Sequence, residues 1–427
     1  MAIFKVEGGH RLHGSITPQG AKNEALQILC ATLLTPERVT VHNIPRILDV
    51  MQLIELLRRM GVEVEQLAED TYSFCAKEID FEYLRTEDYR RRCTRLRGSV
   101  MLIGPMLARF GVGYIPKPGG DKIGRRRRLD THFLGFQKLG AKFNFDIADE
   151  FFMVEGKELK GTYMLLDEAS VTGTANIVMA AVLAKGSTTI YNAAREPEIV
   201  DLQNFINAMG GNVRGAGGSI ITVEGRRALH GGKYRIIADR IVGATYLCAA
   251  ACCGGEVRLR GVDPRPLSTV SGALSEAGCT VKSGEDDVFL QSDGSLRSIR
   301  PVRTAPYPGF PTDAQPVLMA ALLKSAGSTV FVENIFENRY RHVDELARMG
   351  AEVRVAGRVA VVTGREHLHG ARVKCTDLRA GAALVIAGLQ ADGLTRISRI
   401  EHIDRGYESI ERDLGVLGAH VRRETGT

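Results

Sequence analysis

The sequence lacks the features that would assign the chain to a secreted or membrane class. Its amino terminus, MAIFKVEGGHRLHG, carries Lys5 and Glu7 and has no apolar core of a secretory signal. The longer apolar runs, such as NIVMAAVLAKG, are far shorter than the roughly 20 residues that a membrane-spanning helix needs. These absences predict a soluble, cytoplasmic protein that has no membrane partner.

The cysteines lack the spacing of a metal or redox site. None of the eight forms a CxxC pair, and Cys252 and Cys253 have no histidine or second cysteine pair at ligand spacing nearby. Most cysteines lie inside apolar segments, which favours reduced, buried thiols. The cysteine spacing therefore predicts no metal site.

The charge pattern also lacks a strong nucleic-acid signature. The net charge is +6, a mild excess that suits a small anionic substrate and is too diffuse to indicate nucleic acid. The run RRRR, residues 125–128, has no aromatic residues interleaved with it. With 427 residues, 44% of them hydrophobic and 25% charged, the chain is long enough for two well-packed globular domains.

A motif of the form apolar-x-x-apolar-Gly-small-x-apolar recurs six times along the chain. Its glycines are Gly61, Gly140, Gly210, Gly278, Gly350 and Gly418. Such a motif predicts a helix that ends at a glycine and is followed by a short strand. Six recurrences at spacings of about 70 residues predict six α/β units, each packing against its neighbours.

Charged residues stand at the starts of several Ala/Leu-rich segments in these units. They are Lys22, Arg97, Asp239, Arg240, Asp377 and Arg379. A helix amino terminus attracts anions because its free N–H groups and the positive end of its dipole point outward. Each residue alone is weak evidence for an anion site, because a capped surface helix with a solvated side chain also explains it. Their repetition indicates that several helix starts converge on one cleft.

Asp313, in APYPGFPTDAQPV, precedes another such segment. It is either the cap of that helix or a carboxylate held rigidly as a general base. Arg339 and Arg405 follow in FENRYRHVDEL and HIDRGYESI, and arginine favours bidentate recognition of carboxylate and phosphate.

The segment PGGDKIGRRRRLD, residues 118–130, poses a similar choice. Gly119 and Gly120 lead to a lone Asp121, and four arginines follow. The segment is either a solvated loop or a loop that carries a proton donor to an anionic substrate.

Taken together, these motifs resemble the UDP-N-acetylglucosamine 1-carboxyvinyltransferases, a family of enolpyruvyl transferases. The resemblance covers essentially the whole chain and rests on GAKNEAL, RLRGSV, PGGDKIGRR, ASVTGTANI, NAAREPEIVDL, APYPGFPTD, IFENRYRHVDEL, TDLRAGAALV and HIDRGYE. It implies an inside-out α/β barrel of two domains, each of three repeated units, with the active cleft between them. The implied domains are residues 22–237, and residues 1–21 with 238–427.

The resemblance implies transfer of the enolpyruvyl group of phosphoenolpyruvate to the 3-hydroxyl of UDP-N-acetylglucosamine, with release of phosphate. Addition would precede elimination, and the step would be the first committed one of peptidoglycan synthesis, without cofactor or metal. Two alternatives are the sister enzyme that acts on shikimate 3-phosphate and a non-catalytic anion-binding relative. The oligomeric state is not predicted.

The resemblance also implies roles for individual residues. Lys22, Arg126 and Arg405 would hold the phosphate, and Arg339 and Arg379 would complete the phosphoenolpyruvate pocket. The amino sugar would contact Asn23, Asp313 and the backbone of Ile335, with Asp313 as the base. Asp377 would assist proton transfer, and Arg97 would support the ligands. The residues expected around the uridine diphosphate are Arg126, Arg127, Arg128, Leu129, Asp130, Ser170, Val171 and Thr172.

This chain departs from the family at three points. Asp121 stands where most members have cysteine, so the general acid would be a carboxyl group, and fosfomycin, which alkylates the thiol, would not inactivate the enzyme. Arg127 replaces a usual proline, and one extra residue precedes Asp130, which shifts the register of the uridine-binding segment. Glu168 stands where relatives often have lysine.

Overall fold

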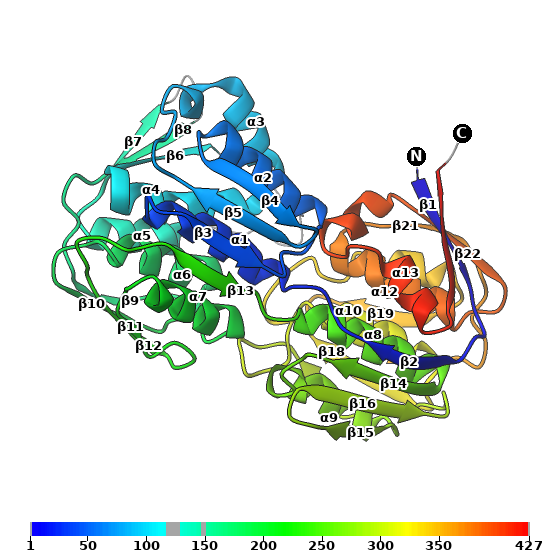
Figure 1. Ribbon diagram of the computed structural model, residues 1–427. Coiled ribbons are helices and arrows are strands. Elements are labelled where there is room, and N and C mark those ends of the chain that lie inside the picture. Colours follow the sequence, from blue (N-terminus) through cyan, green and yellow to red (C-terminus); the bar gives the residue numbers. More distant parts are fainter. Residues whose placement is uncertain (1, 117–128, 147–150, 426–427) are drawn as a thin grey trace. The chain divides into compact units, whose positions relative to one another are not determined.

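The computed structural model describes residues 2–116, 129–146 and 151–425. Packing divides the chain into two compact units (Figure 1). Of the described residues, unit 1 contains 2–19 and 238–425, and unit 2 contains 20–116, 129–146 and 151–237. Their assignment as two enolpyruvyl transferase domains, with limits at residues 22 and 237, stays a prediction.

Unit 2 contains three small sheets in its described residues. The first consists of β13 (Gly232–Arg235), β3 (Val39–His42), β5 (Thr71–Cys75) and β4 (Glu63–Ala68) in spatial order. The second consists of β11 (Val213–Arg214), β12 (Ile220–Glu224), β10 (Ser187–Tyr191) and β9 (Tyr163–Leu165). The third consists of β6 (Val112–Pro116), β8 (Phe151–Glu155) and β7 (Lys142–Asp146).

Unit 1 also contains three sheets. The first consists of β15 (Thr280–Ser283), β16 (Asp287–Ser292), β14 (Gly255–Arg260) and β2 (Leu12–Ile16). The second consists of β17 (Val302–Arg303), β18 (Ser328–Val332), β20 (Val359–Thr363) and β19 (Glu352–Ala356). The third consists of β21 (Arg372–Lys374), β22 (Leu394–Ser398), β1 (Ala2–Glu7) and β23 (His420–Thr425). In all five four-stranded sheets one outer pair is parallel and the other two pairs are antiparallel.

The helices divide between the units in the same way. Unit 2 has α1 (Lys22–Ala31), α2 (Leu48–Arg59), α3 (Glu87–Arg95), α4 (Ile103–Phe110), α5 (Asp130–Lys138), α6 (Val171–Ala181) and α7 (Pro197–Ala208). Unit 1 has α8 (Arg240–Cys253), α9 (Ser268–Glu276), α10 (Gln315–Ala321), α11 (Val343–Ala347), α12 (Leu378–Leu389) and α13 (Ile410–Val416). The short 3₁₀ segments are η1 (Thr32–Leu34), η2 (Tyr83–Arg85), η3 (Arg97–Leu102), η4 (Arg265–Leu267), η5 (Leu322–Lys324) and η6 (Ile400–Arg405).

The core of unit 1 is built around three helices that are apolar on every side. Every residue of α12 and of α10 is buried, and so is most of α8. These three helices pack against one another. A helix that is hydrophobic all round must lie inside the protein, which is why the Ala/Leu-rich segments fold as core elements. The mixed α/β class is thus confirmed, and closure of the sheets into an inside-out barrel stays a prediction.

The six-fold helix–glycine–strand motif is confirmed. Each of its glycines has a positive φ, between 86° and 113°, and follows the end of a helix. The helices are α2, α5, α7, α9, α11 and α13, and the strands that follow are β4, β7, β11, β15, β19 and β23. Glycine reaches this left-handed region without the steric penalty that a Cβ incurs, so it ends the helix and redirects the chain.

The amino-terminal strands complete sheets made mainly by the last part of the chain. β1 pairs with both β22 and β23, and β2 pairs in parallel with β14. β13 pairs in parallel with β3, so the chain returns to the first sheet of unit 2 before it enters unit 1. Within the described residues, no helix is long and apolar enough to cross a membrane.

Candidate active site

Three aspartates of unit 1 stand within two residues of the starts of its three central helices. Asp239 caps α8 by accepting hydrogen bonds from the N–H groups of Ile241 and Val242 at 2.8 and 3.1 Å. Asp377 caps α12 in the same manner, with two bonds of 3.0 Å. Both side chains are almost completely buried. These carboxylates satisfy N–H groups that the first helical turn would otherwise leave without a partner.

Asp313 is different, and its interpretation as a helix cap is wrong. The cap position of α10 is Ala314, with no side-chain cap. The Asp313 carboxylate instead accepts a hydrogen bond from Arg339 Nη2 at 2.5 Å and one from Arg379 Nη2 at 3.3 Å. One carboxylate therefore bridges two guanidinium groups.

The two arginines of this cluster are buried while the carboxylate is partly open. The side chains of Arg339 and Arg379 are 2% and 4% exposed, against 28% for Asp313. Burial alone would lower the pKa of Arg379, but the charge of Asp313, with smaller contributions from Tyr407 and Asp239, outweighs it and holds that pKa above its usual value. Arg379 thus stays charged beside one partly open carboxylate.

The cluster continues through side chains that hold Arg379 in place. Arg379 Nη1 donates to the hydroxyl of Tyr407 at 3.5 Å, and that hydroxyl lies 2.8 Å from Thr245 Oγ1 on α8. Arg339 donates to the carbonyl of Thr312 from Nε and Nη2, at 3.3 and 3.0 Å. The positions of the two guanidinium planes are therefore fixed from at least two sides.

His342 lies close enough to this cluster to interact with Arg339 and Asp377. It is fully buried, and neither ring nitrogen has a hydrogen-bond partner in the described part of the chain. Burial lowers its pKa to about 4; the Asp377 carboxylate opposes this shift and Arg339 adds to it. The imidazole is consequently neutral at physiological pH and does not cancel the charge of either group.

The remaining residues predicted in unit 1 lie on other elements. The N–H of Ile335 donates to Glu333 Oε1 at 2.8 Å, so this N–H is already occupied. Arg405 is partly buried at the end of η6, two residues before Tyr407.

In unit 2, Lys22 is the first residue of α1 and is neither solvated nor free. Its Nζ lies 2.9 Å from Oδ2 of Asp49, in the first turn of α2, and the two side chains are 12% and 5% exposed. Asn23 beside it is exposed. The ion pair fixes the ammonium group at the positive end of α1, where a bound anion would be favoured.

A second cluster of unit 2 joins α5, α6 and η3. Thr172 Oγ1 lies 3.2 Å from Nε2 of His132, whose Nδ1 lies 3.0 Å from the amide of Asn176. Burial, together with the charge of Arg97 at the start of η3, lowers the pKa of His132 to about 3. The ring is therefore a neutral linker between two helices.

The serine of the predicted diphosphate segment begins α6. Ser170 is its cap residue, and its Oγ accepts a hydrogen bond from Gly173 N at 3.2 Å. Val171 and Thr172 follow in the first turn and are partly buried. Glu168, in the preceding turn, is exposed.

Glu24 and Asp201 form a buried acid pair behind α1. Both Glu24 oxygens accept from Ile237 N at 3.3 Å, and Tyr234 donates to Asp201 Oδ1 at 3.1 Å. Burial and the Asp201 charge raise the pKa of Glu24 well above its usual value. Burial also raises the pKa of Asp201, which the interaction with Glu24 opposes. Burial thus favours the protonated form of Glu24 beside Asp201.

Part of the predicted site lies outside the described residues. Asp121, Arg126, Arg127 and Arg128 all belong to 117–128. Leu129 is partly buried at the cap position of α5, and the exposed Asp130 is the first residue of that helix.

Comparisons with known proteins show which family the chain belongs to. The model of the EPSP synthase family (3-phosphoshikimate 1-carboxyvinyltransferase) matches residues 6–414. The chain belongs to the EPSP synthase family of carboxyvinyltransferases. Curated proteins of Bacteroides fragilis and Bacteroides thetaiotaomicron, each named UDP-N-acetylglucosamine 1-carboxyvinyltransferase, are 47% identical to it over 99% of this chain and 100% of theirs.

Solved structures of carboxyvinyltransferases support the fold. The enolpyruvyl transferase NikO from Streptomyces tendae aligns with a TM-score of 0.87 at 24% identity, over 100% of this chain and 99% of that one. An EPSP synthase from Acinetobacter baumannii aligns with a TM-score of 0.76 at 18% identity, over the whole of both chains.

Several residues that hold the predicted site residues in place could not be identified from single motifs. Asp49 pairs with Lys22, and Tyr407 accepts a hydrogen bond from Arg379. Nothing in the sequence around Asp49 or Tyr407 indicates these partners. His132 and Asn176 carried only the signal of a polar residue within an apolar helix. All four position other side chains.

Donor groups suited to a metal lie elsewhere in the carboxyvinyltransferase fold. Within the described residues, one group of three side chains could share an ion, namely Glu7, His10 and His420 on and beside β1 and β23. None of these belongs to the predicted site. The eight cysteines are free, and all except Cys253 are buried, as predicted.

Proposed function

We propose that this protein is a UDP-N-acetylglucosamine 1-carboxyvinyltransferase. It transfers the enolpyruvyl group of phosphoenolpyruvate to the 3-hydroxyl of the sugar nucleotide and releases phosphate, in the first committed step of peptidoglycan synthesis in the cytoplasm. The observation that carries the proposal is the 47% identity, over nearly the full chain, to proteins of that name. Both substrates are small anions, which suits the cationic side chains described above.

Unit 1 supplies the base and part of the anion pocket. Two guanidinium groups on Asp313 favour its ionised form, the form that takes a proton from the sugar hydroxyl as oxygen attacks C2 of phosphoenolpyruvate. Arg339 and Arg379 face the carboxylate and phosphate of phosphoenolpyruvate, and Arg405 binds the phosphate. Asp377 assists proton transfer, and the backbone of Ile335 contacts the amino sugar.

Unit 2 supplies further anion contacts. Lys22 holds the phosphate, Asn23 contacts the amino sugar, and Arg97 supports the ligands. The start of α6, from Ser170 to Thr172, offers N–H groups to the diphosphate, and the segment up to Asp130 contributes beside it.

The general acid is Asp121, with Arg126 on the phosphate. Protonation of C3 accompanies the addition, and loss of a C3 proton with phosphate completes the elimination. A free aspartate has a pKa of about 3.9, so a site that excludes water must favour the protonated carboxyl for this role.

The experiment is a phosphate-release assay with phosphoenolpyruvate and either UDP-N-acetylglucosamine or shikimate 3-phosphate. We expect phosphate release with UDP-N-acetylglucosamine as the acceptor and none with shikimate 3-phosphate. Asp121→Asn should lose this release. Asp263→Asn, at an exposed ion pair with Arg265, is the matched control and should turn over normally. Release that survives in Asp121→Asn would move the proton donor elsewhere. Absence of release with either acceptor would contradict the proposed function.

Fosfomycin provides a second test of Asp121. Because a carboxylate is a far poorer target for alkylation than a thiolate, the wild-type protein should keep its activity during preincubation. Asp121→Cys should gain time-dependent inactivation. Inactivation of the wild-type protein, with the reagent attached to Asp121, would refute this prediction.

A second candidate acceptor is shikimate 3-phosphate, which the name of the matching family model favours. Phosphate release with that acceptor alone would establish it. The motifs NAAREPEIVD and HIDRGYE resemble the sugar-nucleotide enzymes instead.

A further inference from the structure

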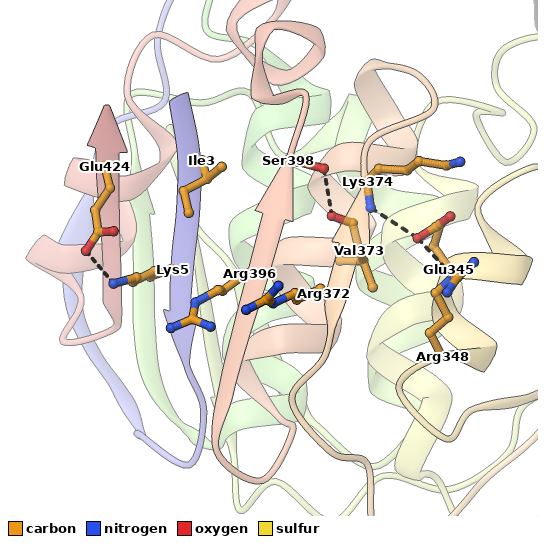
Figure 2. A pocket seen from close by; sticks show the side chains of 10 residues that line it. All are labelled: Ile3, Lys5, Glu345, Arg348, Arg372, Val373, Lys374, Arg396, Ser398 and Glu424. Carbon is orange, nitrogen blue, oxygen red and sulfur yellow. Dashed lines mark hydrogen bonds and ion pairs between the residues drawn. The ribbon is translucent and has the colours of Figure 1, made fainter. Parts of the chain in front are cut away.

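A basic groove lies on unit 1, over the sheet formed by β21, β22, β1 and β23 and beside α11 (Figure 2). Its volume is about 670 Å³. The side chains that line it include five cations, namely Lys5, Arg348, Arg372, Lys374 and Arg396. Two carboxylates, Glu345 and Glu424, also line it. None of these residues is assigned to the transfer reaction.

The strand register aligns four cations in one row across this sheet. Arg372 on β21 pairs with Arg396 on β22, Arg396 with Lys5 on β1, and Lys5 with Arg422 on β23. Directly opposed side chains on neighbouring strands lie about 4.5–5.5 Å apart at Cβ, and like charges in such positions destabilise the sheet. An anion bound over the row would remove that repulsion.

The carboxylates of the groove neutralise only part of the row. Lys5 Nζ lies 2.6 Å from Glu424 Oε1. Glu345 is engaged twice, since it pairs with Arg348 at 3.5 Å and accepts a hydrogen bond from Lys374 N at 3.1 Å.

Three other cations remain without such a partner. Among the described residues, the side chains of Arg372, Arg396 and Lys374 have neither an ion pair nor a hydrogen bond. Figure 2 shows the guanidinium groups of Arg372 and Arg396 next to each other at the same level of the sheet.

We propose that this groove is a second anion site, which binds a chain of linked phosphate groups. Neighbouring strands are about 4.8 Å apart, so a ligand must carry several linked charges to reach Arg396, Arg372 and Lys374 together. Arginine forks match phosphate oxygens in pairs. No aromatic side chain lines the groove, so it offers no platform for stacking bases and favours phosphates over single-stranded nucleic acid.

The test is calorimetric titration of the full chain with inorganic tripolyphosphate. The variant tested, called the groove variant, is the double substitution Arg372→Ser/Arg396→Ser. The matched control is Arg265→Ser/Arg300→Ser, which removes the same charge from exposed arginines of unit 1 that are paired with Asp263 and Glu276. We expect the groove variant to bind at least about tenfold more weakly than wild type and the control to bind as wild type does.

Three other outcomes would overturn the proposal. Equal binding by the groove variant and wild type would place the anion elsewhere, including at the catalytic arginines. Equal weakening in both double variants would indicate an effect of net charge alone. Inorganic monophosphate binding as tightly as tripolyphosphate would contradict recognition of a phosphate chain.

Two further measurements identify the source of the phosphate chain and check folding. A nucleoside triphosphate that binds only as tightly as tripolyphosphate would indicate recognition of the phosphate chain itself. Tighter binding of a single-stranded oligonucleotide at these residues would overturn the proposal in favour of nucleic acid. Without ligand, the groove variant should unfold at or above the wild-type temperature, because it lacks the repulsion across β21 and β22. A lower unfolding temperature would contradict the argument from register.

Discussion

Replacing Asp313 by asparagine should destabilise unit 1 markedly, because this carboxylate alone bridges two buried guanidinium groups. The variant keeps the size of the side chain and removes the charge, so Arg339 and Arg379 lose their shared counterion while remaining 2% and 4% exposed. Each charge-assisted hydrogen bond contributes about 1.5–3 kcal/mol. Since Asp313 is itself 28% exposed, water screens part of the loss, and we expect about 2–4 kcal/mol less unfolding free energy.

The assay is urea unfolding followed by far-ultraviolet circular dichroism and tyrosine fluorescence, since the chain contains no tryptophan and 11 tyrosines. Two units can unfold in two steps, so the loss should appear in the transition of unit 1. Asp263→Asn is the control, because its partner Arg265 is 86% exposed and such surface pairs contribute about 0–1 kcal/mol. An Asp313→Asn loss no larger than the control would refute the reasoning.

Four other substitutions test the buried charges, the motif glycine and a glycine within a helix. Raised pKa values make the buried acid pair of Glu24 and Asp201 stabilising at low pH and less so as pH rises above the usual carboxyl range, so Glu24→Gln should flatten that loss of stability in urea unfolding. His132 acts in the opposite direction. Because its pKa in the folded protein is about 3, the unfolded chain binds the proton first as pH falls, and wild type should lose about 1.5–2 kcal/mol of unfolding free energy between pH 6.5 and 5. His132→Gln should not show this loss. Gly140→Ala should cost about 1–2 kcal/mol in thermal unfolding because φ is +98°, although a Cβ there approaches nothing closer than 3.9 Å. Gly272→Ala, within α9 and in open space, should gain about 0.5–1 kcal/mol.

Local rules explain why much of the fold could be predicted from the sequence. A glycine after an apolar helix, as at Gly350, needs only neighbouring residues to specify its left-handed turn. The same holds for Asp377, whose capping bonds reach two and three residues along the chain. Six repetitions of such local signals indicated the six α/β units.

The site depended on contacts that no local rule contains. Asp313 stands where a cap is usual, yet its carboxylate turns to arginines 26 and 66 residues away. Lys22 has the sequence context of a solvated lysine, and its ion pair with Asp49 forms only when α1 packs beside α2. The buried pair of Glu24 and Asp201 joins α1 to α7 in the same manner. Tertiary packing decides these partners, so a motif identifies the residue type without its environment.

The central claim is enolpyruvyl transfer by addition and elimination, and mass spectrometry of the sugar nucleotide tests it most directly. The protein would be incubated with phosphoenolpyruvate and UDP-N-acetylglucosamine in heavy water. We expect a product heavier by one enolpyruvyl group and carrying deuterium at C3, because the methyl group of the intermediate takes up a solvent deuteron before it loses a hydron. A sugar nucleotide of unchanged mass would contradict the transfer, and a product free of deuterium would contradict the addition–elimination route.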